Sequence, residues 1–225
     1  MRGSLSHRNF SQILRKSLTK PQTPCFSLVP LHMLRVKLLK PIARSIRVFV
    51  LATVVAAAQF GGVSIAGESG SGAQMTTRGG AAPPVGFLVF CLKNPSQCRG
   101  GGSAQVTLSD EMMATLNSVN RAVNRSIRPR NERADRWEIN VRVGDCEDYA
   151  LTKRARLMAL GLPASALRIA TARTRSGVGH AVLVVRTNEG DFVLDNLSSR
   201  IQVWNQTGLR WIAMSGANPR SWNAV

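Results

Sequence analysis

The 225-residue sequence is poor in aromatic side chains: one tyrosine, four tryptophans and seven phenylalanines make up 5% of the chain. Proteins that bind single-stranded nucleic acid combine a basic surface with aromatic side chains on which bases stack. The net charge of +18 supplies the first of these features, but the second is nearly missing. The composition therefore argues against nucleic acid as a partner, and the basic side chains are expected to be solvated.

Acidic residues are absent before Glu68, whereas ten of the thirty lysines and arginines lie in residues 1–66. The remaining chain has twenty basic and twelve acidic side chains, a net charge of +8. An uncharged apolar run at residues 48–58 is shorter than the roughly 20 residues of a membrane-spanning helix but matches the apolar core of a secretion signal. We therefore predict that residues 1–66 are an N-terminal extension with a secretion signal, and that the protein is periplasmic or secreted.

Small residues at Ser64 and Ala66 occupy the two positions that a signal peptidase inspects, which predicts cleavage after Ala66. A site nearer Ala58 is the second candidate. Met33 begins a signal of more ordinary length, so a translation start there is an alternative. An uncleaved signal would hold the chain to the membrane by this segment alone, and an organelle transit peptide is a competing explanation that does not account for the apolar block.

Residues 67–84 are rich in glycine, serine, alanine and threonine, a composition typical of a flexible linker. The folded domain is expected at residues 85–225. Cys91 and Cys98 flank a turn that contains Pro95, and they could close a small disulfide-bonded loop in an oxidising compartment. If residues 1–66, which contain Cys25, are cleaved off and Cys91 pairs with Cys98, Cys146 is the one unpaired thiol. Such a thiol is either reactive or buried and inert.

A first helix is predicted from Ser109, its N-cap, to the residues before Pro129. Its apolar positions recur at intervals of three and four, at Leu116, Val119, Val123 and Ile127. Three asparagines on this helix are expected to be solvated, with a functional role as the alternative: Asn117, Asn120 and Asn124.

A second helix is predicted to begin after Asp145, with Asp148 three residues on as a carboxylate variant of the capping box. Gly161 and Pro163 end it. This places Cys146 at the first helical position, on the exposed lip of the helix. The unpaired N–H groups of a helix N-terminus favour a thiolate over a thiol.

The remainder of the chain is predicted to form strands at residues 167–172, 180–187 and 191–195, with shorter ones at 202–204 and 210–213. Helices followed by an antiparallel sheet make an α+β fold. A two-residue loop at Asn188 and Glu189 pairs Thr187 with Gly190. This register puts His180 diagonal to Asp195 on the same face of the sheet, within about 7–8 Å.

Thiol catalysis needs a nucleophile, a base that takes its proton and a group that orients the base. Cys146, His180 and Asp195 supply one of each, with Asn196 as an alternative orienting group, and His180 is the only histidine after residue 66. These residues predict a thiol hydrolase that works through an acyl-enzyme. An acyltransferase, in which an amine replaces water, and a non-catalytic binding protein that retains the fold are the alternatives.

Several motifs together resemble the bacterial transglutaminase-like cysteine peptidases over about residues 85–225. They are Phe90-Cys91 with Cys98, Val119-Asn120 with Val123-Asn124, Trp137, the block 144–150 around the cysteine, Lys153-Arg154, and the segments 179–183 and 193–197. The resemblance implies a papain-like or transglutaminase-like core with the nucleophile at a helix N-terminus. It also implies that Cys146 is the nucleophile, His180 the general base and then acid, and Asp195 the orienting group.

Some members of this family are periplasmic, calcium-dependent proteases that cut large surface adhesins and so release cells from biofilm. The resemblance therefore implies a protein substrate, such as a surface adhesin or another envelope protein. By position it also implies calcium ligands at Asp145 and Glu147, with Asp148 the weaker candidate, and no organic cofactor. The alternative is that Asp145 and Asp148 only cap the helix and that Glu147 is solvated.

Overall fold

The computed structural model describes residues 74–130 and 135–225. The helices in these ranges are α1 (Val85–Lys93), α2 (Asp110–Ser126) and α3 (Cys146–Ala159). The strands are β1 (Arg78–Gly80), β2 (Arg128–Pro129), β3 (Val143–Gly144), β4 (Leu167–Arg173), β5 (Gly179–Thr187), β6 (Gly190–Leu194), β7 (Gln202–Val203), β8 (Arg210–Ser215) and β9 (Trp222–Ala224).

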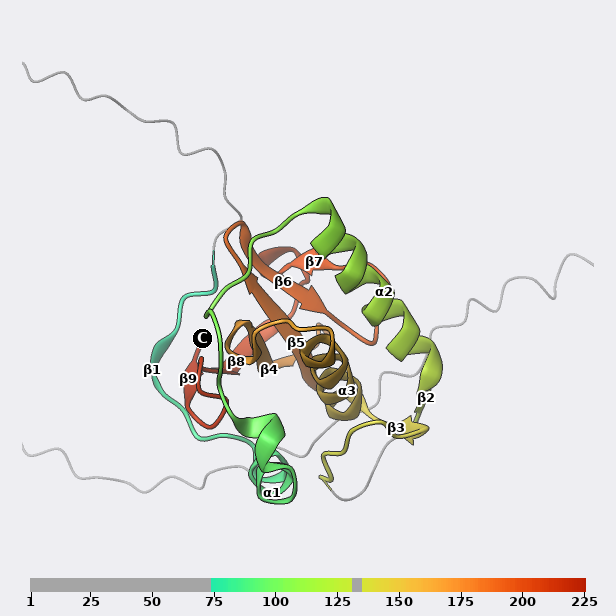
Figure 1. Ribbon diagram of the computed structural model, residues 1–225. Helices are drawn as coiled ribbons and strands as arrows, with labels where there is room; N and C mark the ends of the chain where they lie inside the picture. Colours follow the sequence, from blue (N-terminus) through green and yellow to red (C-terminus); the bar gives the residue numbers. More distant parts are fainter. Residues whose placement is uncertain (1–73, 131–134) are drawn as a thin grey trace, which may run out of the picture.

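Seven of these strands form one sheet in the order β1-β9-β8-β4-β5-β6-β7, and every neighbouring pair is antiparallel. The short strands β2 and β3 pair with each other in parallel beside the start of α3. Helix α3 lies against β5, and α2 packs beside α3 (Figure 1). The predicted α+β class, with helices packed on an antiparallel sheet, is confirmed.

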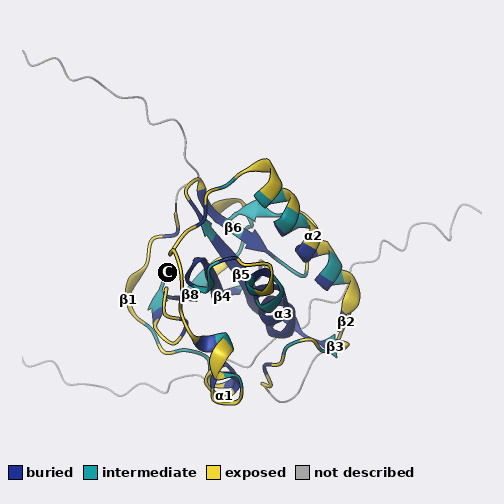
Figure 2. Cartoon of the chain, in the orientation of Figure 1, coloured by how far each residue is buried: buried dark blue, intermediate teal, exposed yellow. Residues whose placement is uncertain are grey.

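The two faces of the sheet bury different sets of side chains because neighbouring residues of a strand point to opposite faces. Leu183 and Val185 of β5 join the main core with residues of all three helices. Val182 and Val184 belong to a smaller cluster on the other face, formed by strand residues and Met75. Strand β5 is thus buried on both faces, as its dark blue colour shows (Figure 2).

Helix α2 begins and ends as its sequence predicts. The Ser109 Oγ atom accepts a hydrogen bond from the Met112 N–H at 3.1 Å, and the helix stops at Ser126, before Pro129. Helix α3 is followed by Gly161 with a φ of 90°, the left-handed conformation that glycine adopts readily after a helix. No helix within the two described ranges is long and apolar enough to span a bilayer.

Part of the expected linker at 67–84 is packed on the sheet. Met75 is buried, and its N–H donates to Asp191 Oδ2 at 2.8 Å. Strand β1 then pairs with β9 at the edge of the sheet. The chain is therefore not a free tether from Met75 onward. Residues 67–73 and the expected secretion signal lie outside the described residues.

Cys91 and Cys98 are joined by a disulfide that closes a loop of sequence separation 7, as their spacing predicts. Both residues are buried, and the bond ties α1 to the single turn of 3-10 helix at Pro95–Cys98. The predicted small loop is confirmed.

Candidate active site

The start of α3 is fixed by the predicted capping box. The Asp145 N–H donates to Asp148 Oδ2 at 3.3 Å, and the Glu138 N–H donates to Asp148 Oδ1 at 2.8 Å. A Cβ atom on Gly144 would lie 2.1 Å from Asp148 Oδ2, so a larger residue would break this arrangement. The glycine and the two aspartates together make Cys146 the first residue of the helix.

The Cys146 side chain is not on an exposed lip, as its helix position suggested, but is buried at 1% exposure. The Ala181 N–H donates to its Sγ atom at 3.1 Å, and Glu147 Oε2 lies 3.3 Å from the same sulfur. Cys146 is disulfide-bonded in this structure, so the chemistry below is that of the reduced thiol. The expectation of a lone thiol concerns the chain without residues 1–66 and stays a prediction.

His180 and Asp195 meet through the register of the β5–β6 hairpin. Thr187 pairs with Gly190, as the two-residue loop predicts, and His180 Nε2 lies 2.8 Å from Asp195 Oδ1. The other ring nitrogen, Nδ1, is then the one that can exchange a proton with a sulfur. Because Ala181 follows His180 and its N–H reaches Cys146 Sγ, the backbone at His180 lies next to the sulfur.

The Asp195 carboxylate is stabilised as an anion. Burial acts to raise its pKa, but the charge of His180 and its hydrogen bond, the Leu197 N–H at 2.9 Å and the charge of Lys153 lower it more, so the pKa lies below the usual 3.8. Asp195 is thereby suited to hold an imidazolium ring.

Two asparagines of α2 hold the loop that follows Asp195. Asn124 Nδ2 donates to the Asp195 carbonyl at 3.0 Å and to the Ser198 carbonyl at 3.2 Å, and Asn120 is fully buried with its Nδ2 3.4 Å from the same Ser198 oxygen. The expectation of solvated positions is wrong for Asn120 and Asn124. Their spacing of four residues, each next to a core valine, was the signal that could have indicated a buried role.

The carboxyl group of Glu147 is buried in the protein, which contradicts the alternative that it is solvated. Burial, the charge of Asp145 and a hydrogen bond with Asp145 raise the pKa of Glu147 far above its usual value. Its Oε1 atom has no hydrogen-bond partner in the described part of the chain. Across residues 74–130 and 135–225, no cluster of three or more histidine, cysteine, aspartate or glutamate side chains forms a metal site.

Lys153 is a buried amine next to the end of β6. It has no exposed surface, and its Nζ atom donates to the Leu194 carbonyl at 3.2 Å. Burial lowers the pKa of Lys153 to about 7, against the opposing effect of the Asp195 charge. Sequence reasoning had no signal for this position beyond its place in the family motif.

The lowered pKa of Lys153 makes its contribution to stability depend on pH. Between its folded value of about 7 and its ordinary value of 10.5, the unfolded chain binds the proton and the folded chain does not, so stability rises with pH. Lys153→Met removes this effect. We expect the free energy of unfolding of the wild type, minus that of Lys153→Met, to grow by about 1 kcal/mol per pH unit from pH 7.5 to 9.5. Urea unfolding of both proteins measures it, and a constant difference contradicts the prediction.

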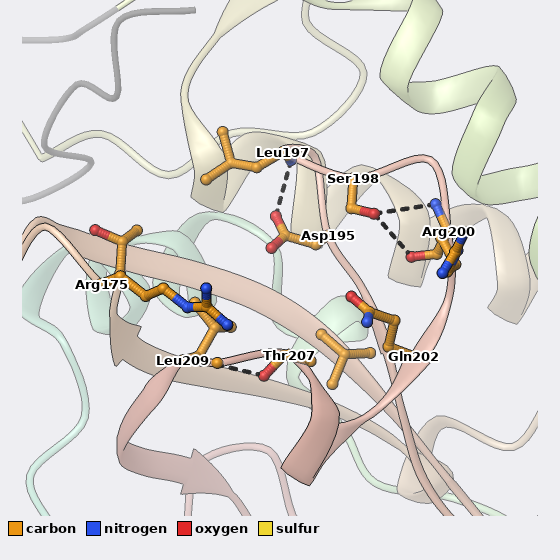
Figure 3. Close-up of a pocket in the computed structure, with 11 residues that line it drawn as sticks. Arg175, Asp195, Leu197, Ser198, Arg200, Gln202, Thr207 and Leu209 are labelled. Carbon is orange, nitrogen blue, oxygen red and sulfur yellow. Dashed lines mark hydrogen bonds between the residues drawn. The ribbon is translucent and has the colours of Figure 1, made fainter. Parts of the chain in front are cut away.

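A pocket of about 200 Å³ opens beside Asp195 (Figure 3). Asp195 is the one residue of the candidate triad that lines it, since Cys146 and His180 do not. Two arginines, Arg175 and Arg200, stand on its rim with exposed side chains. The remaining lining residues are Thr174, Val193, Leu197, Ser198, Gln202, Thr207, Gly208 and Leu209.

Among solved structures, the chain is similar to Legionella pneumophila LapG, at 28% sequence identity and a TM-score of 0.43 over 47% of this chain and 64% of LapG. The calcium-bound form of LapG has 27% sequence identity and a TM-score of 0.44, over 47% of this chain and 66% of LapG. The EGTA-treated form has 28% identity and a TM-score of 0.43, over 47% of this chain and 63% of LapG. This chain thus spans less than two thirds of each LapG chain.

No curated protein matches the chain. The family model described as bacterial transglutaminase-like cysteine proteinase matches residues 77–225, which include the helix that begins at Cys146 and the complete β5–β6 hairpin. The chain therefore belongs to the bacterial transglutaminase-like cysteine proteinases.

Proposed function

We propose that the protein is an exported peptidase that cuts an amide bond in a protein substrate through a Cys146-His180-Asp195 triad. One observation carries the proposal: the His180 ring is held by Asp195 at 2.8 Å, while the amide of the next residue reaches the Cys146 sulfur at 3.1 Å. These two contacts support the proposal, because thiol catalysis requires a nucleophile, a base and an orienting group close together.

In the first half of the reaction, the His180 Nδ1 atom takes the thiol proton and Cys146 Sγ attacks the carbonyl carbon of the substrate. A carbon–sulfur bond forms, and the carbonyl oxygen becomes an oxyanion. His180 then returns the proton to the leaving nitrogen as the carbon–nitrogen bond breaks. Asp195 keeps the ring in the tautomer and orientation that both transfers need.

In the second half, water replaces the departed amine. His180 removes a proton from the water, whose oxygen attacks the thioester carbon, and the carbon–sulfur bond breaks to release the acid and the thiol. The backbone N–H of Cys146, at the helix N-terminus, is suited to stabilise the oxyanion in both halves. The Ala181 N–H, which donates to the sulfur, is suited to stabilise the thiolate between turnovers.

A surface adhesin or another envelope protein is the substrate that we propose, from the family motifs around Cys146 and His180. The pocket beside Asp195 supports a polymeric substrate because it extends the site beyond the reacting atoms along the β6–β7 side of the sheet. A peptide that runs past the triad would place flanking side chains there.

Replacing Cys146 by serine in cells tests this function. Serine keeps the size of the residue but is a far weaker nucleophile without a thiolate. We expect at least one envelope protein to accumulate at full length in Cys146→Ser cells and to appear as two fragments with a new N-terminus in wild-type cells. Mass spectrometry of cell-envelope and medium fractions measures both forms. Identical fragment patterns in the two strains would remove the support for a peptidase.

Calcium is the metal that the family resemblance implies, and the residues present fit a hard cation in part. Asp145 and Glu147 offer buried carboxylate oxygens, and Glu147 Oε1 has no hydrogen-bond partner in the described part of the chain. Asp148 stays the weaker candidate, because each of its oxygens already accepts a backbone N–H, from Glu138 or Asp145. We propose Asp145 and Glu147 as ligands, with backbone carbonyls and water to complete the coordination. A bound cation would lower the repulsion between these carboxylates and the Cys146 thiolate.

Thermal unfolding tests the calcium site without an activity assay. Calcium at about 100 times its Kd should stabilise the wild type by about 2.7 kcal/mol, seen as a higher Tm that EGTA reverses. The double variant Asp145→Asn, Glu147→Gln should lose this response, and magnesium at the same concentration serves as the control cation. A calcium response that is equal in the wild type and the double variant contradicts the proposed ligands.

Export is proposed from the apolar run at 48–58 and the small residues Ser64 and Ala66. The Cys91–Cys98 disulfide supports it, since such bonds persist mainly in oxidising compartments. The N-terminal sequence of the protein from the periplasmic fraction is expected to begin at Gly67.

A further inference from the structure

We propose that Lys153 is a positioning residue for the triad: by donating a hydrogen bond to the Leu194 carbonyl, it fixes the orientation in which the Asp195 carboxylate contacts His180. This inference rests on the proposed function and adds a residue that does not touch the reacting atoms. The observation that carries it is the distance of 3.2 Å between Lys153 Nζ and the carbonyl oxygen of Leu194, the residue just before Asp195.

The place of Lys153 on α3 gives it this reach. It follows Cys146 by seven residues, which is close to two helical turns, so both residues lie on the same side of the helix, about 10 Å apart along its axis. That side packs on β5, which runs beside β6. The same helix therefore carries the proposed nucleophile at its N-terminus and, two turns later, the lysine that binds the last residue of β6, next to Asp195.

The surroundings of Lys153 give no other reason for a lysine. Its side chain has no exposed surface, and no carboxylate of the described residues forms an ion pair with it within 4 Å. Of the charged groups in neighbouring elements, Asp195 acts on it directly, and His180 is hydrogen-bonded to Asp195. A buried amine is costly unless it is hydrogen-bonded, and its hydrogen bond is made to the residue beside Asp195.

The end of β6 is held from two helices. Lys153 of α3 binds the Leu194 carbonyl, and Asn124 of α2 binds the Asp195 carbonyl at 3.0 Å. The Leu197 N–H and His180 Nε2 both contact Asp195 Oδ1, at 2.9 and 2.8 Å. Lys153 and Asn124 thus hold the peptide groups on the two sides of the Asp195 Cα atom, so loss of the Lys153 hydrogen bond should change the His180–Asp195 geometry.

The test compares Lys153→Met with Arg154→Met in the full-length chain. Methionine keeps an unbranched side chain of similar length but cannot donate. Arg154 is the matched control: it is a buried cation on the same helix, at 2% exposure, that donates to the carbonyls of Leu167, Gln97 and Ala164, away from Asp195. Both proteins also carry His7→Gln and His32→Gln, so that His180 is the only imidazole.

The first readout is the low-field N–H resonance of the His180 ring in its hydrogen bond to Asp195, which needs no substrate. We expect Lys153→Met to lose or shift this resonance and Arg154→Met to retain it, even where Arg154→Met lowers Tm more. The second readout is turnover of the substrate protein: kcat should fall on the order of 10²-fold in Lys153→Met, with little change in KM.

A folded Lys153→Met protein with an unchanged resonance and unchanged kcat overturns the proposal, as does equal loss of the resonance in both variants. If Lys153→Met does not fold, Lys153→Arg replaces it, and this variant keeps a donor at the site. Retention of the resonance then supports the positioning role, and its loss contradicts it. If no variant or wild-type protein cleaves any substrate, the proposed function fails, but the resonance still decides the role of Lys153.

Discussion

Replacing His180 by alanine is expected to lower the rate of substrate cleavage by about 10⁴-fold or more, because His180 is the proposed base and acid of both half-reactions. His180 is the only histidine after residue 66, and its Nε2 atom is held by Asp195 at 2.8 Å. Without an imidazole, the Cys146 thiol has no base, and the leaving amine has no acid. Single-turnover cleavage of the substrate found in Cys146→Ser cells measures the rate.

His180→Gln is the companion variant, since glutamine keeps a polar side chain of similar reach but cannot transfer a proton near neutral pH. We expect both variants to remain folded, with circular dichroism spectra like that of the wild type. A loss of less than tenfold in either folded variant contradicts the role of His180 as base and acid.

The second large effect is expected for Asp195→Ala, with a loss on the order of 10²- to 10⁴-fold in kcat. Alanine removes the acceptor that holds the His180 ring and also the acceptor of the Leu197 N–H. Asp195→Asn should be much less impaired, because its amide oxygen can still accept from the ring and asparagine fills this position in some thiol proteases. The kcat values of the two variants, measured with the same substrate protein, make the comparison.

The relative kcat values of Asp195→Ala and Asp195→Asn distinguish an orienting role of Asp195 from a role of its negative charge. If Asp195→Asn is as impaired as Asp195→Ala, the negative charge is what matters, and the account of Asp195 as an orienting group is wrong. Asn196→Ala serves as the neighbouring control, because the structure places the contact to His180 on Asp195 and not on the alternative residue. Asn196→Ala should therefore leave kcat within about threefold of the wild type.

The parts of the site that the sequence could predict are those set by local rules. A two-residue loop fixes which strand positions face each other, so the meeting of His180 and Asp195 followed from the spacing of the hairpin. Asp145 and Asp148 begin the helix because a capping box is local in sequence. These features depend on residues a few positions apart.

Other parts depend on packing between distant segments. Lysines and asparagines on helices are usually solvated, so the burial of Lys153 and Asn120, and the contacts of Asn124 with the loop after β6, required knowledge of what packs against them. The Ala181 N–H that reaches the sulfur is a backbone group, which nearly every residue type has, so the sequence does not indicate this contact. The strands β1 and β9 have three residues each, too few for an alternating pattern to appear.

The central claim is that Cys146 is a nucleophile activated by His180. The most direct measurement is the rate at which iodoacetamide alkylates Cys146 at pH 6 in the reduced protein, followed by mass spectrometry of the peptide that contains it. Most ordinary thiols are protonated at this pH. The account predicts alkylation faster than that of free cysteine, with at least about a tenfold decrease in His180→Ala. Equal rates in the wild type and His180→Ala, both no faster than free cysteine, would contradict it.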